Sequence, residues 1–238
     1  MTDANSVLGH VEKLYRFPVK SLLGESQQHL EIGIRGVESD RLFAVTDQAG
    51  KFGSHKSTRR FAKLPGLFSM RAYLRGDEAR IVFPDGADMA VGEAATDARV
   101  SDIVGQPVTV ATEQAVSHFD AAAIHVISTA SLGWLQSMLP GATIDPLRFR
   151  ANVVVACDGE DPVESSWIGK TLSLGSVQLE VIANTERCVM TTLAQGDLPN
   201  EPDILTTIGR QLGLNFGVYA TVSRPGVVAV GDTVHVGD

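Results

Sequence analysis

Short runs of alternating apolar residues, separated by turn-forming residues, recur along almost the whole chain and constrain its fold most strongly. Alternation over about four to eight residues is typical of half-buried strands. A final strand pair, 216–222 with 227–230, is expected to close the sheet. Because short strands dominate over a few helices, the pattern favours a β-barrel, and the predicted fold class is mainly β with a few helices (α+β). The predicted strands are residues 10–17, 42–46, 69–74, 80–83, 123–127, 152–156, 171–182, 216–222, 227–230 and 234–236.

Three helices are expected between these strands. Polar or proline residues that favour helix starts, and glycines that favour helix stops, mark their ends. The first runs from Thr96 as cap to Gly105 as stop, the second follows a cap at Ser128 or Thr129, and the third runs from Pro202 to Gly213.

Charge and cysteine content exclude several classes of protein. A net charge of −8 argues against binding to nucleic acid through its phosphates, so an anionic ligand needs a local basic pocket. The sequence shows no secretion signal and no apolar run of membrane-spanning length, which predicts a cytoplasmic protein without a membrane partner. Cys157 and Cys188 are the only cysteines, too few for the four thiolates of an iron-sulfur cluster.

Cys188 is the most interesting single residue. It follows the predicted strand and a turn-forming cluster at residues 184–186, a common place to present a reactive group. The adjacent Arg187 favours the thiolate, the form that binds metals or attacks electrophiles. The alternative is that Cys188 is a small, buried hydrophobic residue. The same role is expected for Cys157, which follows an apolar strand.

Four motifs stand in order along the chain: Phe17-Pro-Val-Lys20-Ser21-Leu, the Asp40-Arg41 pair, Pro146-Leu-Arg148-Phe-Arg150-Ala-Asn152 and Arg187-Cys188-Val-Met-Thr191-Thr192. Together they resemble the MOSC family, named for the C-terminal domain of molybdenum-cofactor sulfurases. The N-terminal motifs are similar to the β-barrel domain that precedes MOSC in the mitochondrial amidoxime-reducing component and its bacterial relatives. The resemblance covers nearly the whole chain.

The resemblance implies a MOSC-type β-barrel preceded by a smaller β-rich domain. The polar interval 112–120 is the expected seam, which gives an N-terminal domain at residues 7–112 and a MOSC domain at residues 113–238. It also implies the molybdenum cofactor, a pterin (molybdopterin) whose dithiolene holds the metal and whose phosphate the protein must neutralise. Pyridoxal phosphate is not expected, because sulfurases carry it on another domain.

The resemblance also implies roles for individual residues. Cys188 is the expected catalytic residue and metal ligand, and soft sulfur suits such a centre. The implied cofactor-binding residues are Lys20, Ser21, Arg41, Asp120, Arg150, Asn152, Arg187, Thr191 and Thr192.

Simpler readings stay open for many of these positions. Each basic residue can be a surface charge, and the two threonines can serve only a turn or strand. Arg148 either assists the site or lies at a solvated strand edge. The cluster from His55 to Arg60 either replaces a basic contact of the family or is a charged loop. Glu186 departs from the family pattern and leaves the substrate preference open.

Three functions are compatible with these residues. The first is an oxidoreductase that reduces small N-hydroxylated compounds, with Cys188 on molybdenum and electrons from a separate donor protein. The second is a sulfur- or cofactor-carrier module that passes a Cys188 persulfide or the intact cofactor to a client molybdoenzyme. The third is a non-catalytic barrel in a larger assembly, without cofactor or reactive thiol.

Overall fold

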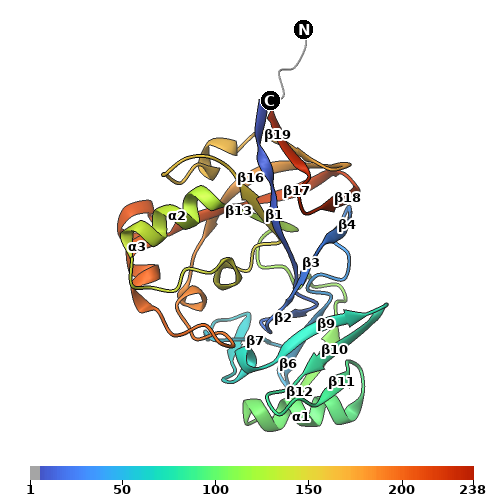
Figure 1. Ribbon diagram of the computed structural model, residues 1–238. Coiled ribbons are helices and arrows are strands. Elements are labelled where there is room, and N and C mark those ends of the chain that lie inside the picture. Colours follow the sequence, from blue (N-terminus) through green and yellow to red (C-terminus); the bar gives the residue numbers. More distant parts are fainter. Residues whose placement is uncertain (1–5) are drawn as a thin grey trace.

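The computed structural model describes residues 6–238, and seven of its strands close into a barrel (Figure 1). Neighbouring strands pair antiparallel except β13 and β14, and β1 closes the ring by pairing with both β14 and β19. The barrel predicted from the sequence is confirmed. Its strands are β1 (Ser6–Arg16), β14 (Val153–Ala156), β13 (Ile124–Ser128), β17 (Asn215–Arg224), β16 (Val177–Glu186), β15 (Thr171–Leu174) and β19 (Thr233–Gly237).

Two helices cover one side of the barrel. α2 (Thr129–Met138) and α3 (Pro202–Leu212) pack through Leu135, Ile204 and Ile208 in one apolar cluster with Phe149 and Phe216. The Ser128 side chain accepts a hydrogen bond from the Ser131 N–H and caps α2. Pro202 opens α3 and Gly213, at φ 58°, ends it, so both predicted helices are confirmed.

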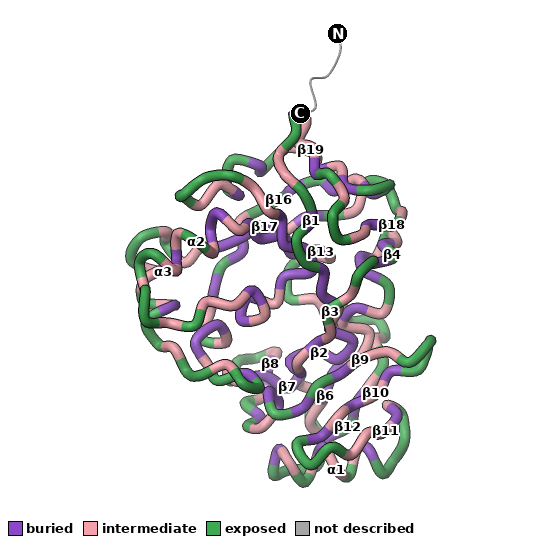
Figure 2. Tube along the Cα trace, in the orientation of Figure 1, coloured by how far each residue is buried: buried purple, intermediate pink, exposed green. Residues whose placement is uncertain are grey.

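A second apolar core lies below the barrel in Figure 1, between it and α1 (Ala94–Val104), which contributes Val100 and Val104. This core is built on two sheets, and its residues are different from those that fill the barrel interior. Figure 2 shows exposed positions along α1 and α3, while β13 and the first half of β17 in the barrel are largely buried. The first sheet contains β12 (Val108–Thr112), β6 (Phe43–Asp47), β7 (Phe52–Ser54), β8 (Phe61–Lys63) and β2 (Val19–Lys20); the second contains β9 (Arg71–Arg75), β10 (Glu78–Val82) and β11 (Asp88–Ala90).

The remaining short elements connect these layers. β3 pairs with the end of β1, and β18 pairs with β4. Four 3-10 turns lie in the connections. The short elements are β3 (Glu25–Gln27), β4 (His29–Gly33), β5 (Gly36–Val37), β18 (Gly226–Ala229), η1 (Leu67–Ser69), η2 (Pro146–Phe149), η3 (Glu164–Trp167) and η4 (Val189–Thr191).

Three local predictions were wrong. β18 pairs with β4 rather than with β17, so residues 216–222 and 227–230 are not a strand pair. Residues 171–182 form two strands with a turn between them, because Gly175 adopts φ 56°. α1 begins at Ala94, and Thr96 is a buried helical residue whose hydroxyl donates to the Ala90 carbonyl. Gly105, at φ 75°, ends that helix as predicted.

The first strand of the chain belongs to the barrel formed mostly by later strands. β1 precedes residue 112 in the chain but pairs with strands that follow it. The expected division into two domains at residue 112 therefore stays a prediction. Among residues 6–238, no helix combines the length and apolar character required to cross a bilayer.

Candidate functional site

A pocket opens between the barrel and the layer that contains β7 and β8. It encloses about 820 Å³ of space, its open mouth included. Six basic and two acidic side chains line it, in a chain whose net charge is −8. Nine of the ten predicted site residues lie in its wall, and Thr192 does not. The nine are Lys20, Ser21, Arg41, Asp120, Arg150, Asn152, Arg187, Cys188 and Thr191, and this space is called the cysteine pocket below.

Cys188 reaches the pocket from the turn that follows β16. The strand continues through Glu186 with irregular pairing to β17, so the turn predicted at residues 184–186 was wrong. Cys188 then begins η4, and its carbonyl accepts from the Thr191 N–H at 3.1 Å and the Thr191 hydroxyl at 3.0 Å. Thr192 donates its hydroxyl to the Val189 carbonyl at 2.8 Å. The two threonines therefore hold the turn that presents the half-buried thiol.

The Arg187 side chain turns into the barrel wall. Its Nη2 donates to the Phe149 carbonyl at 2.8 Å, and its Nη1 lies 3.4 Å from Nε2 of His125. The guanidinium also lies over the Phe149 ring at 5.3 Å. Burial lowers the pKa of Arg187 and lowers that of His125 well below its usual value, so His125 is neutral and accepts from the arginine.

Arg148 and Arg150 stand two residues apart and serve different purposes. Arg148 is fully buried and donates to three main-chain carbonyls, those of Thr143, Leu193 and Pro199. The solvated strand edge expected as one alternative is therefore wrong, and Arg148 lies in the pocket wall with its donors bound to carbonyls. Arg150 follows the η2 turn at φ 56°, and its Nη1 donates to the Leu22 carbonyl.

Arg150 retains a buried donor that no protein group satisfies. Its Nη2 has no hydrogen-bond partner, and its guanidinium lies 4.3 Å from the centre of the Phe17 ring. Burial and the nearby Arg41 lower the pKa of Arg150. A crowded, desolvated cation with a free N–H is stabilised by an anion, so this corner of the pocket suits a phosphate or another anionic group.

Asn152 and Arg41 belong to one hydrogen-bonded network around the buried Asp40. The Asn152 amide accepts from the His125 N–H at 3.2 Å and donates to the Tyr15 carbonyl and to Asp40. Arg41 pairs with Asp40 and donates through Nη2 to the Arg150 carbonyl at 3.1 Å. The side-chain amide of Asn152 is thus committed to holding Asp40 and the strands, rather than free for a ligand.

Lys20 joins the two sides of the pocket. Its Nζ donates to the His118 carbonyl and to Oδ1 of Asp120, both at 2.7 Å. Burial lowers the pKa of Lys20 to about 8, against the opposing pull of Asp120. Ser21 follows at φ 66°, a left-handed conformation that ends the short strand β2 at the pocket wall.

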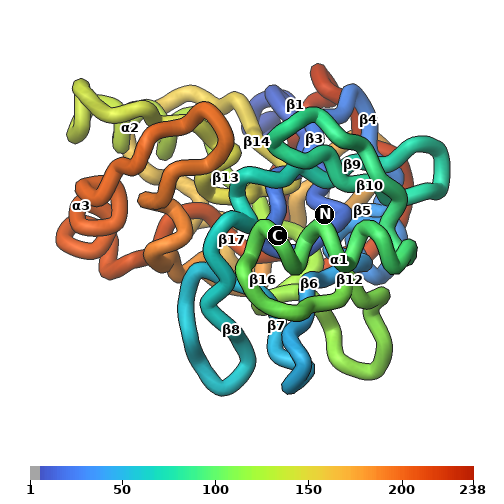
Figure 3. Tube along the Cα trace, turned by 90° about the horizontal axis from the view of Figure 1, so that it is seen from below, coloured from blue at the N-terminus to red at the C-terminus, as the bar shows by residue number. Residues whose placement is uncertain are grey.

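The stretch of residues 51–60, called the basic segment below, forms the outer lip. Ser54 and Lys56 line the cysteine pocket, and His55 stacks on Phe68 at 4.4 Å. Arg60 donates from Nη2 to the Ser117 and Phe119 carbonyls. Figure 3 shows β7 and β8 at the edge of the molecule, away from α2 and α3. Lys56 therefore adds a basic group to the pocket, while Arg59 stays exposed.

Several further residues of the wall were not predicted as site residues, among them His125, Tyr219, Met190 and Ser54. His125 and Tyr219 lie in the neighbouring barrel strands β13 and β17. The sequence of each strand does not indicate that these side chains line the same pocket. Burial raises the pKa of Tyr219, so its hydroxyl keeps its proton at neutral pH. Met190 accepts a 3.8 Å hydrogen bond from the Ser54 hydroxyl, which links the cysteine turn to the outer lip.

The donor set fits a metal that brings most of its own ligands. Within residues 6–238, no three His, Cys, Asp or Glu side chains gather closely enough to hold a metal ion. Cys188 supplies a thiol sulfur and Met190 a thioether sulfur in the same wall, and the surrounding cations suit an anionic, metal-carrying organic group. A barrel with one cysteine thiol in a basic pocket thus defines a protein suited to an anionic metal cofactor.

The chain belongs to the MOSC family. The family model described as "MOSC domain" matches residues 113–235, and "MOSC N-terminal beta barrel domain" matches residues 8–130. The MOSC family is associated with the molybdenum cofactor.

Relatives with known names support this assignment. Molybdenum cofactor sulfurase of Drosophila erecta is 34% identical over 116 residues, and that of Drosophila ananassae is 36% identical over 112 residues. The matches span 48% and 46% of this chain but only 14% of each fly protein. The YuaD protein from Bacillus subtilis shares the fold, with a TM-score of 0.55 at 17% identity over 96% of this chain and 94% of that one.

Proposed function

We propose that the cysteine pocket binds the molybdenum cofactor with Cys188 as the protein ligand of the metal, and that the protein reduces small N-hydroxylated compounds. One observation carries the proposal. The half-buried thiol of Cys188 shares a pocket with six basic side chains, and one of them, Arg150, keeps an unpartnered buried N–H. The Arg-Cys-x-x-Thr-Thr motif, similar to that of the amidoxime-reducing component, supports the same assignment.

The residues of the pocket divide the work of holding such a group. Arg150, Arg41 and Lys20 supply positive charge and N–H donors for the phosphate and the polar edge of the pterin. Thr191 and Thr192 fix the turn that aims the Cys188 sulfur. When bound, the cofactor supplies the redox centre for cleavage of the N–O bond.

The protein must also provide a proton when the N–O bond breaks. Tyr219 lines the pocket with a protonated hydroxyl, and burial raises its pKa. The hydroxyl can donate to the oxygen that gains negative charge as the N–O bond breaks. Glu186, at the pocket wall, can exchange protons with solvent because its side chain is exposed.

The decisive experiment purifies the protein from cells that make the cofactor and measures molybdenum, pterin and benzamidoxime reduction. We expect bound metal and turnover in the wild type, and loss of turnover in Cys188→Ala. The matched control is Cys157→Ala, since Cys157 packs against the barrel core outside the pocket. Metal-free wild-type protein, or full activity in Cys188→Ala, would contradict the proposal.

The second candidate is a sulfur- or cofactor-carrier module that hands a Cys188 persulfide to a client molybdoenzyme. The similarity to proteins named molybdenum cofactor sulfurase favours it. It predicts that intact-mass analysis finds one added sulfur atom on Cys188 in protein that lacks molybdenum. A metal centre that persists through turnover favours the reductase instead.

A further inference from the structure

We propose that the basic segment and the groove beside it form a docking surface for a small acidic redox protein, the electron donor of the proposed reductase. This inference rests on the proposed function and names the chemistry of its partner. The segment of residues 51–60 contains Lys51, Lys56, Arg59 and Arg60 and no acidic residue. In a chain with a net charge of −8, such a run is a local exception.

The groove beside the segment has the composition of an interaction surface. It is an open groove of about 950 Å³, its open side included, and none of its thirteen lining residues, all within the described part of the chain, is acidic. Lys51, Arg59 and Arg60 supply its charge. Val116, which is 63% exposed, contributes apolar surface, and Phe52 lines the groove although it is only 7% exposed. Cations around an exposed apolar patch suit a partner that presents carboxylates around an apolar centre.

The groove and the cysteine pocket lie on the two sides of one rim. Arg60 donates to the carbonyls of Ser117 and Phe119, and Phe119 itself lines the cysteine pocket. Lys56, from the same segment, also lines that pocket. A protein seated on the groove therefore sits beside the mouth through which electrons must reach the proposed metal site.

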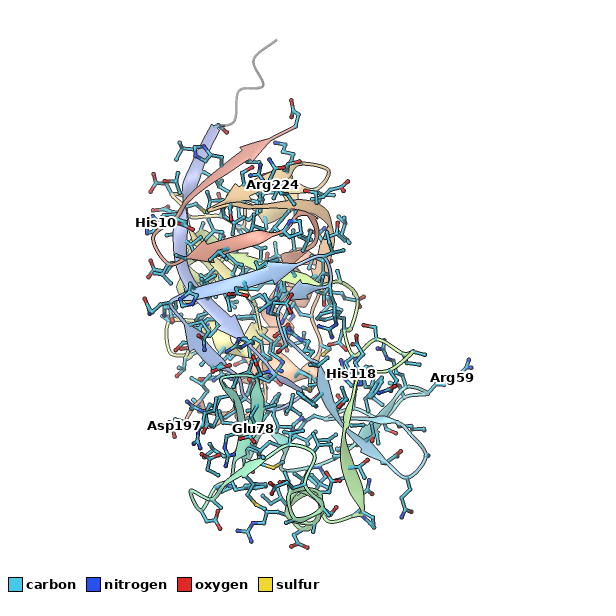
Figure 4. All side chains as sticks on the ribbon, turned by 90° about the vertical axis from the view of Figure 1, so that its right-hand side faces the viewer. His10, Arg59, Glu78, His118, Asp197 and Arg224 are labelled. Carbon is cyan, nitrogen blue, oxygen red and sulfur yellow. The ribbon has the colours of Figure 1, made fainter. Side chains whose placement is uncertain are left out.

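The charge distribution also orients an approaching partner. The net negative charge of the molecule repels an acidic protein over most of the surface, and the basic segment attracts it at one place. Figure 4 shows Arg59 projecting outward from the edge of the molecule, while Arg224 lies at the far end of the barrel. Docking steered in this way is fast at low ionic strength and weakens as salt screens it.

The electron balance requires such a donor. Reduction of an N-hydroxy group breaks the N–O bond, takes up two electrons and two protons, and yields the N–H compound and water. The redox protein supplies the electrons and is itself oxidised, and the protons come from water through groups of the pocket such as Tyr219.

The test compares two electron donors on the molybdenum-loaded protein. Reduced methyl viologen is a small donor that needs no docking, and photoreduced flavodoxin is an acidic protein donor. The variant carries Lys51→Glu and Arg59→Glu, neither of which lines the cysteine pocket. The matched control carries Arg210→Glu and Arg224→Glu, two exposed residues of α3 and β17.

We expect flavodoxin-driven benzamidoxime reduction to fall by about tenfold or more in the Lys51/Arg59 variant at low ionic strength. Viologen-driven reduction should stay unchanged, and the control variant should match the wild type with both donors. The flavodoxin-driven rate of the wild type should also fall steeply with added salt.

Two outcomes overturn the docking surface. One is flavodoxin-driven reduction that is absent in the wild type or equal in the wild type and the Lys51/Arg59 variant, and the other is an equal loss in the control. Absence of viologen-driven reduction in the wild type is a different result, because it removes the proposed reductase itself.

Discussion

The two walls of the cysteine pocket use positive charge in opposite ways. On the barrel wall, residues 148–152 and 187–191, Arg148 and Arg187 are buried and donate to main-chain carbonyls, and Arg150 keeps one buried donor for a ligand. On the basic segment, Arg59 is exposed, and Arg60 donates to the carbonyls of residues 117 and 119. Buried charge without partners is costly, so the barrel wall must satisfy its donors with carbonyls or with a bound anion, whereas Arg59 can leave its charge to solvent or to another molecule. Position in the fold, rather than residue type, therefore decides what a cation does here.

The largest expected effect is on the barrel wall. Arg148→Leu leaves the carbonyls of Thr143, Leu193 and Pro199 without their donor in the interior. We expect the free energy of unfolding to fall by about 3–5 kcal/mol, measured by urea denaturation. Arg210→Leu, at an exposed position of α3, is the control. A loss below about 1 kcal/mol at Arg148 would remove the contrast between the two walls.

Lys20 lies between the two walls, and its contribution to the free energy of unfolding depends on pH. Burial lowers its folded-state pKa from 10.5 to about 8, so between these values the unfolded chain binds more protons than the folded one. Stability from this group therefore rises with pH over that window and is constant below about 8.

The Lys20→Met variant isolates the pH-dependent contribution of Lys20 to stability. The unfolding free energy of the wild type should rise relative to the variant by about 2–3 kcal/mol between pH 8 and 10.5. Urea titrations of both proteins across that range measure the difference. A difference that does not change with pH would show that Lys20 titrates as it does in water.

A smaller effect is expected at the cysteine turn. Thr191→Val removes the hydroxyl that donates to the Cys188 carbonyl, and should cost about 1 kcal/mol of stability. If Cys188 binds the metal, molybdenum content should also fall, because the turn no longer fixes the sulfur. Thr191→Ser retains the hydroxyl and should restore both the stability and the molybdenum content. Equal behaviour of the Val and Ser variants would assign the turn to other contacts.

The smallest effect is expected on the basic segment. Arg59→Ala removes an exposed side chain, so the free energy of unfolding should change by less than about 0.5 kcal/mol in thermal or urea denaturation. A loss comparable to that of Arg148→Leu would mean that the segment, like the barrel wall, depends on its charges for folding.

Local signals predicted the parts of the fold that depend on a few neighbouring residues. The serine cap at Ser128, the proline start at Pro202 and the glycine stops at Gly105 and Gly213 all confirm expectations from the sequence. Each depends on the backbone within one helical turn, which the sequence specifies directly. The placement of Cys188 just after a strand followed from the same kind of signal.

Long-range pairing was harder to predict. Nothing near residues 227–230 indicates that their partner is β4, because strand partners distant in the chain leave no mark in local alternation. The turn predicted at residues 184–186 failed for a similar reason, since pairing with β17 extends β16 through polar residues. Arg148 and Arg150 look alike in the sequence, and only the η2 turn and the left-handed Arg150 separate their directions.

The ring of the barrel joins the two ends of the described chain, because β1 pairs with β19 across more than two hundred residues. During synthesis, the first strand must wait for the last before the ring can close. Contacts of such long sequence separation slow folding and leave strand edges open in the meantime. Loss of residues 233–237 should therefore leave a chain that stays open and tends to aggregate, even though the lower layer retains a core of its own.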